Sequence, residues 1–487
     1  MSERLTRRQL LALGAAGAGA LGVGAAGLLV VEAASPFLTD ESSSEPKSSD
    51  DAWFEPSVLS SAGGVLAVEL RVAEREVLIG ERRVRMLSYN GTVPGPTLHL
   101  RPGDTLRVRL RNELAVPTNL HTHGLHVSAA GNGDNPFLSV GPGESFEYEF
   151  ALRADHPSGV FWYHPHRHGS VADQLFGGLS GAIVVDRDEW GASAPRVAVV
   201  SDVTFSGGAV AAASAMERMI GRNGETVLVN GRISPVIESP AGSRQRLLVI
   251  NACASRYLDL RLRGLDARVR AIDSRLHAER GAERVVLAPG NRLDVVVATP
   301  REPTELRAVS YDRGCVGMGA HGSATAAPTA SLLTIRPVAT APSAPVADAV
   351  VESVRDLRQA PVDRRRVLTL DMGAGMGMFG ARFVIDGREF DERRVDQRVD
   401  LGAIEEWTIR NRSSMDHPFH LHVWPMQLVR LGGRDVESVE FRDVVDVPAG
   451  GEVVVRIAFD RFPGRTVYHC HILDHEDLGM MGVVEVA

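Results

Sequence analysis

A pattern of two glycine-led strands is written three times along this chain, and it constrains the fold more than any other feature. In each copy an asparagine lies nine positions after a glycine, at Gly103 and Asn112, Gly242 and Asn251, and Gly402 and Asn411. A second glycine opens another strand-like segment 40, 48 and 48 positions after the first, in PGESFEYEF, PGNRLDVVV and AGGEVVVRI. Apolar residues alternate after each glycine turn, which is the period of a half-buried β-strand. The sequence therefore predicts three copies of one β-rich unit.

The glycines and prolines between these segments predict the fold class. Glycine and proline recur at short intervals and convincing helical stretches are few, which favours an all-β protein whose units are small Greek-key barrels or sandwiches. The length of 487 residues also suits three domains of ~150 residues each. We place the units at residues 57–190, 194–340 and 360–487, with a Pro/Ala-rich linker at 341–359.

Composition and charge exclude several classes of protein. Hydrophobic residues make up 44% and charged residues 23%, which are ordinary values for a globular protein with a sizeable core. The net charge is -8, and no run of basic residues offers a local positive field for phosphate backbones. We therefore expect no nucleic-acid partner.

The N-terminal segment is typical of an export signal. Thr6-Arg7-Arg8-Gln9-Leu10-Leu11 precedes a Gly/Ala-rich, weakly apolar stretch, and small residues at Ala33-Ala34-Ser35 suit a signal peptidase. We interpret residues 1–34 as a twin-arginine signal peptide, which implies the twin-arginine export machinery as a partner and a periplasmic, cell-surface or secreted protein. A membrane anchor is the alternative, although so many glycines make a poor spanning helix. Residues 35–56 are acidic and Ser-rich, which predicts a disordered tether.

Histidines gather at fixed places in the first and third units. In a β-strand, residues i and i+2 point to the same face, so a His-x-His pair presents two imidazoles to one site. Four such pairs predict a cluster of eight imidazoles, enough for several metal ions. The pairs are His121/His123, His164/His166, His420/His422 and His469/His471.

Cys470 stands between two of these histidines and must point the other way along a strand. A thiolate there, with His417, His475 and a weak thioether from Met480, is the ligand set of a blue-copper centre. Zinc fits less well, because eight imidazoles exceed the four ligands of a closed site. Non-haem iron sites usually include a carboxylate ligand, and the histidine pairs bring no carboxylate with them. The pattern therefore predicts copper in two environments, back to back.

These motifs carry a family resemblance. HTHG, FWYHPH, HPFHLH and HCHILDHEDLGMM, with YNGTVPGPT ahead of the first, closely resemble the three-domain multicopper oxidases, including laccases and cuprous oxidases. The resemblance implies three cupredoxin domains, four coppers per chain (one type 1, one type 2 and a type 3 pair) and reduction of O₂ to water. It implies type 1 ligands His417, Cys470, His475 and Met480, type 2 ligands His121 and His420, and type 3 ligands His123, His164, His166, His422, His469 and His471.

The same resemblance assigns further roles. Glu476 matches an acidic residue of the family beside the cluster, where oxygen reduction needs protons, and Asp134 is a second, weaker candidate or a solvated turn residue. An electron donor is expected to reach type 1 copper through His417, and the electron to pass from Cys470 into His469 and His471. The second unit has the sequence YDRGC, ending at Cys315, where the third has His-Cys-His, so we expect a spacer without copper.

Three functions are compared with these motifs, and two of them are compatible. The leading hypothesis is an exported oxidase that acts on phenols or aromatic amines. The alternative is a metallo-oxidase that oxidises Cu(I); cuprous oxidases have a carboxylate and a methionine before HPFHLH, and this chain has Ser413 and Met415 there. A third class, copper-free homologues used in cell division, should lack ligands, and this chain lacks none. The donor pocket is made of loops, so sequence does not name the donor.

Several other residues stay open. His168 continues the alternation of His164 and His166, but it matches no family ligand and is interpreted as a neighbouring or loop histidine. Cys253 and Cys315 form either a disulfide or two buried thiols. Soft Cu(I) contacts and plain loop or core packing are both possible for the methionines of DMGAGMGMFG, which are Met372, Met376 and Met378.

Overall fold

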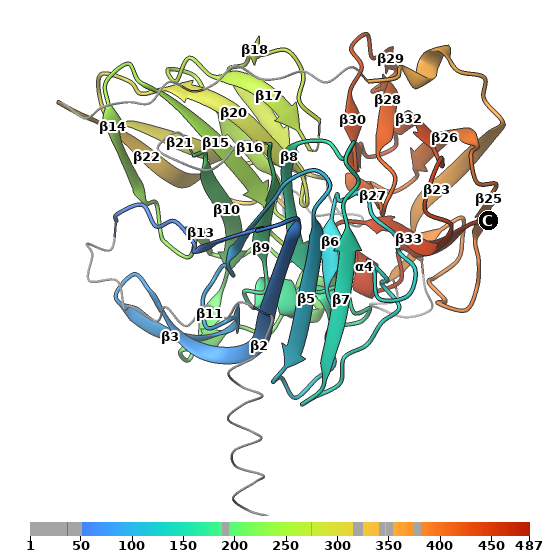
Figure 1. Cartoon of the computed structure of the whole chain (residues 1–487), viewed down its shortest axis with the longest axis horizontal. Helices are drawn as coiled ribbons and strands as arrows, with labels where there is room; N and C mark the ends of the chain where they lie inside the picture. Colours follow the sequence, from blue (N-terminus) through green and yellow to red (C-terminus); the bar gives the residue numbers. More distant parts are fainter. Residues whose placement is uncertain are drawn as a thin grey trace, which may run out of the picture.

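The computed structural model describes residues 51–187, 194–273, 275–314, 325–339, 354–374 and 381–487, together with residues 37 and 346. Six β-sheets, arranged as three pairs that follow one another along the chain, make up most of this part (Figure 1). The predicted all-β fold is confirmed. None of the helices in the described ranges is long and apolar enough to cross a membrane.

The first pair of sheets contains the first two histidine pairs. Its five-stranded sheet has the order β1 (Val58–Ser60), β4 (Thr97–Leu100), β9 (Gly181–Val185), β8 (Gly159–His164) and β6 (His121–His123). Its six-stranded sheet has the order β11 (Phe205–Ser206), β12 (Ala209–Val210), β3 (Arg82–Tyr89), β2 (Val65–Ile79), β5 (Thr105–Asn112) and β7 (Ser145–Ala151). β11 and β12 come from the segment assigned to the second unit, yet they extend this sheet through β3.

The second pair lies next along the chain. Its six-stranded sheet has the order β13 (Thr226–Val229), β10 (Arg196–Val203), β15 (Arg244–Asn251), β20 (Arg292–Ala298), β17 (Arg268–Ile272) and β18 (Arg280–Gly281). Its five-stranded sheet has the order β14 (Val236–Pro240), β22 (Ala330–Val338), β21 (Thr304–Val309), β16 (Leu258–Arg261) and β19 (Arg284–Leu287).

The third pair carries the remaining ligand motifs. Its larger sheet has the order β24 (Ala381–Ile385), β23 (Arg364–Ala374), β26 (Ile404–Asn411), β32 (Glu452–Ala458), β28 (Met426–Leu431) and β29 (Arg434–Asp435), and β30 (Phe441–Arg442) also pairs with β28. Its five-stranded sheet has the order β25 (Gln397–Val399), β34 (Met481–Val486), β33 (Gly464–Cys470), β27 (His417–Leu421) and β31 (Val444–Val447).

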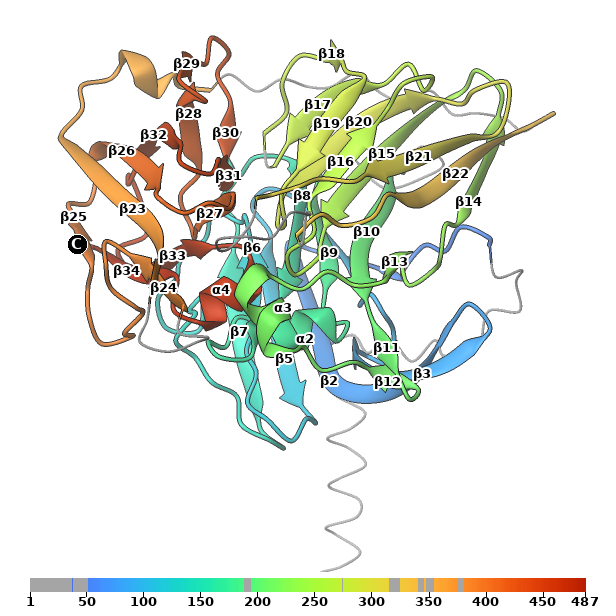
Figure 2. The same ribbon diagram turned by 180° about the vertical axis from the view of Figure 1, so that it is seen from behind.

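Among the described residues, each unit contributes one short α-helix. The α-helices are α2 (Val171–Phe176), α3 (Ala215–Ile220) and α4 (Leu473–Asp477), and a 3-10 turn, η1 (Leu357–Gln359), precedes β23. α4 contacts both α2 and α3, so segments of all three units meet there (Figure 2). A capping box starts α3, because the Ser214 hydroxyl accepts the Glu217 N–H and the Glu217 carboxylate accepts the Ser214 N–H.

The repeated asparagine explains why the pattern recurs. Asn112, Asn251 and Asn411 each end the central repeated strand, and each side chain makes the same three hydrogen bonds. Its oxygen accepts the N–H two residues later, and its amide donates to one carbonyl four or five residues later and to a second carbonyl before the next repeated glycine. The first glycines have φ of +96°, +78° and +93°, a region that favours glycine. The repeat thus fixes the loop that leads into β6 and β27.

Buried apolar side chains fill the space within each pair of sheets. Separate clusters lie within the first, second and third pairs, as the alternation predicts. A fourth cluster joins the units: Trp162 of β8 packs there with Val197 of β10, Leu248 of β15 and Leu473 of α4. The units therefore share apolar packing, which holds the ligand-bearing strands in register with each other.

Candidate metal centre

Eight histidines from four segments meet between the first and third units. β6 pairs with β8 so that His121 lies opposite His164, and β27 pairs with β33 so that His420 lies opposite His469. The two sheets face each other closely enough for imidazoles to stack across the boundary, at 3.8 Å between the ring centres of His121 and His422. The residues are His121, His123, His164, His166, His420, His422, His469 and His471, all at most 2% exposed.

Hydrogen bonds to one nitrogen orient several of these rings. The Nδ1 of His420 donates to the carbonyl of Asp443 (2.7 Å), and the Nδ1 of His164 donates to the carbonyl of Pro165 (2.8 Å). His123 is reversed, because its Nε2 lies 3.0 Å from the Asp443 carboxylate. In a metal site, such outer bonds fix the tautomer and leave the other nitrogen to bind. The geometry therefore assigns Nε2 of His164 and His420, and Nδ1 of His123, as the free donors.

The free nitrogens converge as metal ligands do. The Nε2 atoms of His166, His422 and His469 lie 3.1–3.2 Å from one another. Ligand atoms of His121, His123 and His164, and of His121, His420 and His422, also come within 4.8 Å of one another.

The charge state of the cluster also fits a metal. Burial lowers the pKa of all eight imidazoles, and for His166 and His469 the pKa falls to about 4, so the rings are neutral ligands at neutral pH. Within the described residues, several buried ring nitrogens have no hydrogen-bond partner, among them Nε2 of His121, His164 and His420, Nδ1 of His123 and both nitrogens of His471. Unpartnered buried nitrogens are costly unless an ion takes them, so the residues present fit copper.

A second ligand group lies on the other side of β33. The Nδ1 atoms of His417 and His475 lie 3.3 and 3.9 Å from the Sγ of Cys470. Met480 is fully buried in the same apolar cluster as Cys470, and its carbonyl accepts the Cys470 N–H at 3.0 Å. Burial raises the pKa of the Cys470 thiol, so binding of a cation would release a proton there. This donor set, with two imidazoles, a thiol and a nearby thioether, suits a single copper.

The Nε2 atoms of His417 and His475, which face away from Cys470, have different partners. His417 is fully buried, and its Nε2 lies 2.8 Å from the Ser413 hydroxyl, which belongs to its own loop. The Nε2 of His475 donates to the carbonyl of Met219 at the end of α3 (3.1 Å). His475 is as fully buried as His417, so the expected donor route through His417 stays a prediction. His475 points toward the surface helix α3.

A buried ion pair holds α4 beside His475. The guanidinium of Arg222, which follows α3, donates to both oxygens of Asp474 at 2.6–3.1 Å. Arg222 also donates to Asp173 of α2 at 2.7 Å. Sequence reasoning missed this pair, because the partners come from different units with no fixed spacing.

Three carboxylates touch the eight-histidine cluster. Asp134 lies 2.9 Å from Nδ1 of His121 and accepts the N–H of Thr122 at 2.8 Å, so it is a cluster residue and not a solvated turn residue. Glu476 is fully buried 3.1 Å from Nδ1 of His469, and burial raises its pKa to about 7. The third, Asp443, was not found by sequence reasoning, since it lies outside every motif.

The remaining candidates lie outside these groups or outside the described residues. His168 is half-buried and packs on the ring of Phe390 with 4.7 Å between ring centres. Cys253 is a buried free thiol that contacts the carbonyl of Val200, and Cys315 lies outside the described residues. Met372 packs partly buried on the core of the third unit. Met376, Met378 and the N-terminal signal also lie outside the described residues.

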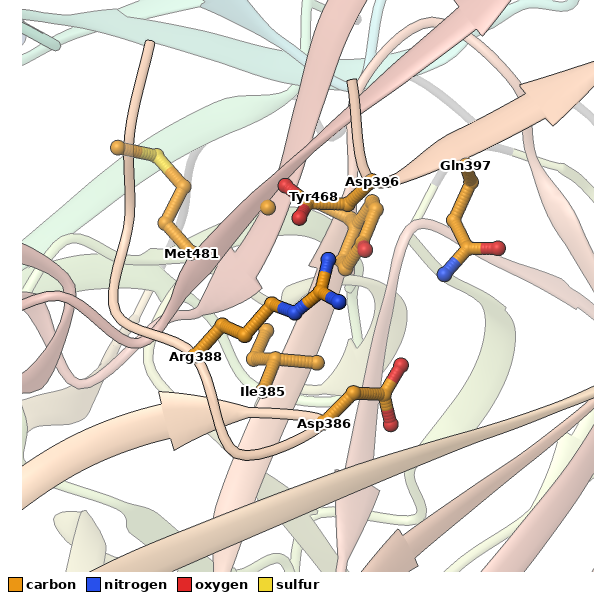
Figure 3. Close-up of a pocket in the computed structure, with 8 residues that line it drawn as sticks. Ile385, Asp386, Arg388, Asp396, Gln397, Tyr468 and Met481 are labelled. Carbon is orange, nitrogen blue, oxygen red and sulfur yellow. The ribbon is translucent and has the colours of Figure 1, made fainter. Parts of the chain in front are cut away.

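A polar cavity of about 230 Å³ lies close to this region but is separate from it. It is lined by residues of β24, β25, β33 and β34 and the turns beside them, and the guanidinium of Arg388 lies between Asp396 and Asp386 in it (Figure 3). Tyr468 and Met481 line the cavity and adjoin His469 and Met480 in sequence, but neighbouring strand residues point to opposite faces. None of the ligand candidates lines this cavity.

Comparisons with known proteins identify the family. Two family models, both described as multicopper oxidase, match residues 71–189 and 361–487, together half of the chain. The chain is a multicopper oxidase. A multicopper oxidase of Staphylococcus aureus is 27% identical over 417 residues, which cover 82% of this chain and 83% of that one.

Solved structures agree with this oxidase assignment. A multicopper oxidase from Campylobacter jejuni, described as a metallo-oxidase, matches with a TM-score of 0.76 and 28% identity, covering 91% of this chain and 98% of its own. A laccase-like multicopper oxidase of the lignin-degrading Ochrobactrum sp. matches with a TM-score of 0.76 and 25% identity over 89% of this chain and 99% of its own. The oxidase is thus a copper-dependent oxidoreductase built of cupredoxin-like units, and it uses O₂ and a reducing substrate.

Proposed function

We propose that four coppers divide between the two ligand groups. His417, Cys470, His475 and Met480 would hold one type 1 copper. His166, His422 and His469 would hold one copper of the type 3 pair and His123, His164 and His471 the other, while His121 and His420 would hold type 2 copper. When bound, copper supplies one-electron redox chemistry at the first group and O₂ reduction at the second.

The observation that carries this proposal is the position of Cys470. Its sulfur belongs to the single-copper group, while the flanking His469 and His471 turn their imidazoles into the eight-histidine cluster. Covalent bonds of three consecutive residues therefore connect the two groups. Electron uptake and oxygen reduction can take place at separate sites and still be coupled.

The buried carboxylates suit the proton side of the reaction. Reduction of one O₂ to two waters takes four electrons and four protons. Glu476 has a pKa of about 7 because it is buried, so it can hold and release a proton near neutral pH beside His469. Asp134 orients His121 through Nδ1 and takes the second catalytic role that we propose.

For the electron donor, we propose phenols or aromatic amines. The Ochrobactrum relative is described as active towards lignin model compounds, and His475 directs its Nε2 toward the surface helix α3, where such a donor could approach. A second candidate is Cu(I), in line with the Campylobacter relative described as a metallo-oxidase. One observation favours it: α3 lies over His475, and it exposes half of Met216 and packs Met219 on the core.

One comparison distinguishes the two donors. We would measure O₂ consumption with a bulky phenol and with Cu(I), on the copper-loaded enzyme and on Met216→Leu, which keeps the size of the side chain and removes the thioether. The phenol hypothesis expects a higher kcat/KM for the phenol and no effect of the substitution. A higher kcat/KM for Cu(I), with KM for Cu(I) raised in Met216→Leu, would overturn it in favour of the metallo-oxidase.

We also propose that the protein is exported, with residues 1–34 as a twin-arginine signal, 35–56 as a tether, cupredoxin units at 57–190, 194–340 and 360–487, and a linker at 341–359. The Arg7-Arg8 motif supports export through the twin-arginine machinery. Changing both arginines to lysine should leave the protein in the cytoplasm, whereas Arg4→Lys, just outside the motif, should not. Equal export of both variants would contradict the proposal.

A further inference from the structure

The second unit carries no copper ligand that we propose, yet it reaches the eight-histidine cluster. The turn before β20 presses Gly290 against the cluster, so that a Cβ there would lie 3.0 Å from the rings of both His123 and His471. Asn291 follows in the turn, and Arg292, the first residue of β20, is completely buried. A side chain of the second unit therefore lies directly behind the proposed ligands.

Arg292 contacts all three units. Its Nε donates to the carbonyl of Val160 in the first unit at 3.1 Å. Its two terminal nitrogens donate to the two carboxylate oxygens of Asp443 in the third unit, one of them at 2.6 Å. It also pairs with Asp273 of its own unit at 3.3 Å. This two-fold (bidentate) contact with Asp443 fixes the plane of that carboxylate. A lysine cannot make it, because it has only one terminal nitrogen.

Asp443 in turn fixes two of the histidines. One carboxylate oxygen lies 3.0 Å from Nε2 of His123, and its main-chain carbonyl accepts Nδ1–H of His420 at 2.7 Å. Asp273 secures the other side of the residue, because it accepts the N–H of Asp443 at 3.1 Å. A carboxylate that binds the outer nitrogen of a ligand histidine sets its tautomer and orientation.

We propose that Arg292 is a positioning residue of the oxygen-reducing site: it clamps Asp443, which holds His123 with Nε2–H turned outward and Nδ1 free for the metal. The second unit is then not a passive spacer, as its missing ligands suggest from sequence. It supplies the outer support of a site whose ligands come entirely from the other two units. This inference rests on the proposed division of copper ligands.

Two variants separate positioning from general stability. Arg292→Lys keeps the positive charge and loses the two-fold contact. The double variant Arg292→Met/Asp443→Asn removes both charges of that contact, so that neither partner is left buried with its charge unpaired. Asp273, the other partner of Arg292, keeps the main-chain N–H groups of residues 292 and 443 as donors. Arg256→Lys is the matched control, because Arg256 is a buried arginine of the same unit that pairs with Asp202 (2.8 Å) and contacts no cluster histidine among the described residues.

The measurements are copper content, the absorption of the type 1 centre and the electron paramagnetic resonance (EPR) spectrum of type 2 copper, on purified copper-loaded protein. For Arg292→Lys and the double variant, we expect normal type 1 absorption and copper retention at the cluster that is weakened ~10-fold or more. The type 2 spectrum should also change, because the Asp443 carbonyl holds the type 2 ligand His420. Arg256→Lys should keep all three signals of the natural chain.

Two results would overturn the role of Arg292. The first is that Arg292→Lys and Arg256→Lys give the same copper content, type 1 absorption and type 2 spectrum. The other is a double variant that regains both thermal stability and the natural type 2 spectrum, since Arg292 would then act only on stability. The copper content of the unsubstituted protein is measured before any variant is compared. If that protein binds no copper at the cluster, the proposed ligand division itself is refuted.

Discussion

Replacing Arg222 by methionine should destabilise the protein by about 3 kcal/mol, because it breaks the buried ion pair that joins the second unit to α4. Arg222 and Asp474 are 2% and 0% exposed, so water cannot replace the lost contact. Breaking such a pair costs ~3–5 kcal/mol. Asp474 keeps the main-chain N–H of residue 222 as a donor at 3.0 Å, which places the expected cost at the lower end.

The assay is thermal unfolding of the copper-loaded protein, followed by circular dichroism and by loss of the type 1 absorption. For domains of 150–250 residues, 1 kcal/mol corresponds to about 2–4 °C, so the midpoint should fall by roughly 6–12 °C. Because α4 contains His475, we expect the type 1 absorption to disappear no later than the circular dichroism signal. Loss of the colour well after the backbone signal would contradict this placement of the pair.

Arg218→Met is the control, since Arg218 pairs with Asp173 at the surface, where the two side chains are 36% and 47% exposed. Such pairs contribute at most ~1 kcal/mol. The double variant Arg222→Met/Asp474→Asn should recover most of the loss, because no buried charge is left alone. Equal midpoint shifts for Arg222→Met and Arg218→Met would refute the reasoning.

Four further outcomes test the site and its surroundings. Cys470→Ser should remove the blue colour and the oxidase activity together, and a blue, active serine variant would rule out Cys470 as the type 1 ligand. His420→Ala should keep the blue absorption and lose O₂ reduction; bleaching with intact O₂ consumption would reverse the assignment. Met480→Leu should keep the blue band and raise the type 1 potential, because a weak axial thioether is lost; an unchanged potential in a redox titration would remove Met480 from the ligand set. Asp446 accepts the Tyr257 hydroxyl at 2.7 Å, and burial raises its pKa to about 7. The unfolded carboxyl ionises near pH 4, so folded Asp446 holds a proton between about pH 4 and 7 that the unfolded chain releases, and stability falls as the pH rises through this window. Glu476 contributes in the same direction, so Asp446→Asn should lose less stability than the natural chain between pH 4.5 and 8 in denaturation curves, and equal losses would contradict this.

Features that depend on local spacing were predictable from sequence. The strand period and the repeated glycine and asparagine indicated the all-β fold, and the structure gives each repeated asparagine the same three hydrogen bonds. The alternation around Cys470 predicted that His469 and His471 leave the strand on the face opposite the sulfur. Both inferences work because i and i+2 geometry is set by the backbone alone.

Contacts between units could not be predicted in this way. Asp443 and Arg292 are 151 positions apart. Asp443 lies outside every motif, and the repeat PGNRLDVVV, which contains Arg292, predicts a strand and not a partner, so no spacing rule relates the two residues. β11 and β12 follow the last strand of the first pair of sheets in the chain, yet β12 pairs with β3 and extends that pair. Such pairing depends on which sheet edge is open in the folded protein, and the sequence does not show this. The outer hydrogen bond of His475 likewise depends on where α3 packs.

The sequence by itself determined the kind of strand, the ligand types and the division of Cys470 from its neighbours, because each follows from residues close together in the chain. Tertiary structure alone decided which nitrogen of His123, His164 and His420 is free, which carboxylates stand behind the ligands and that His475 lies against α3. These depend on hydrogen bonds between side chains brought together from three units, and packing, not sequence distance, sets those partners.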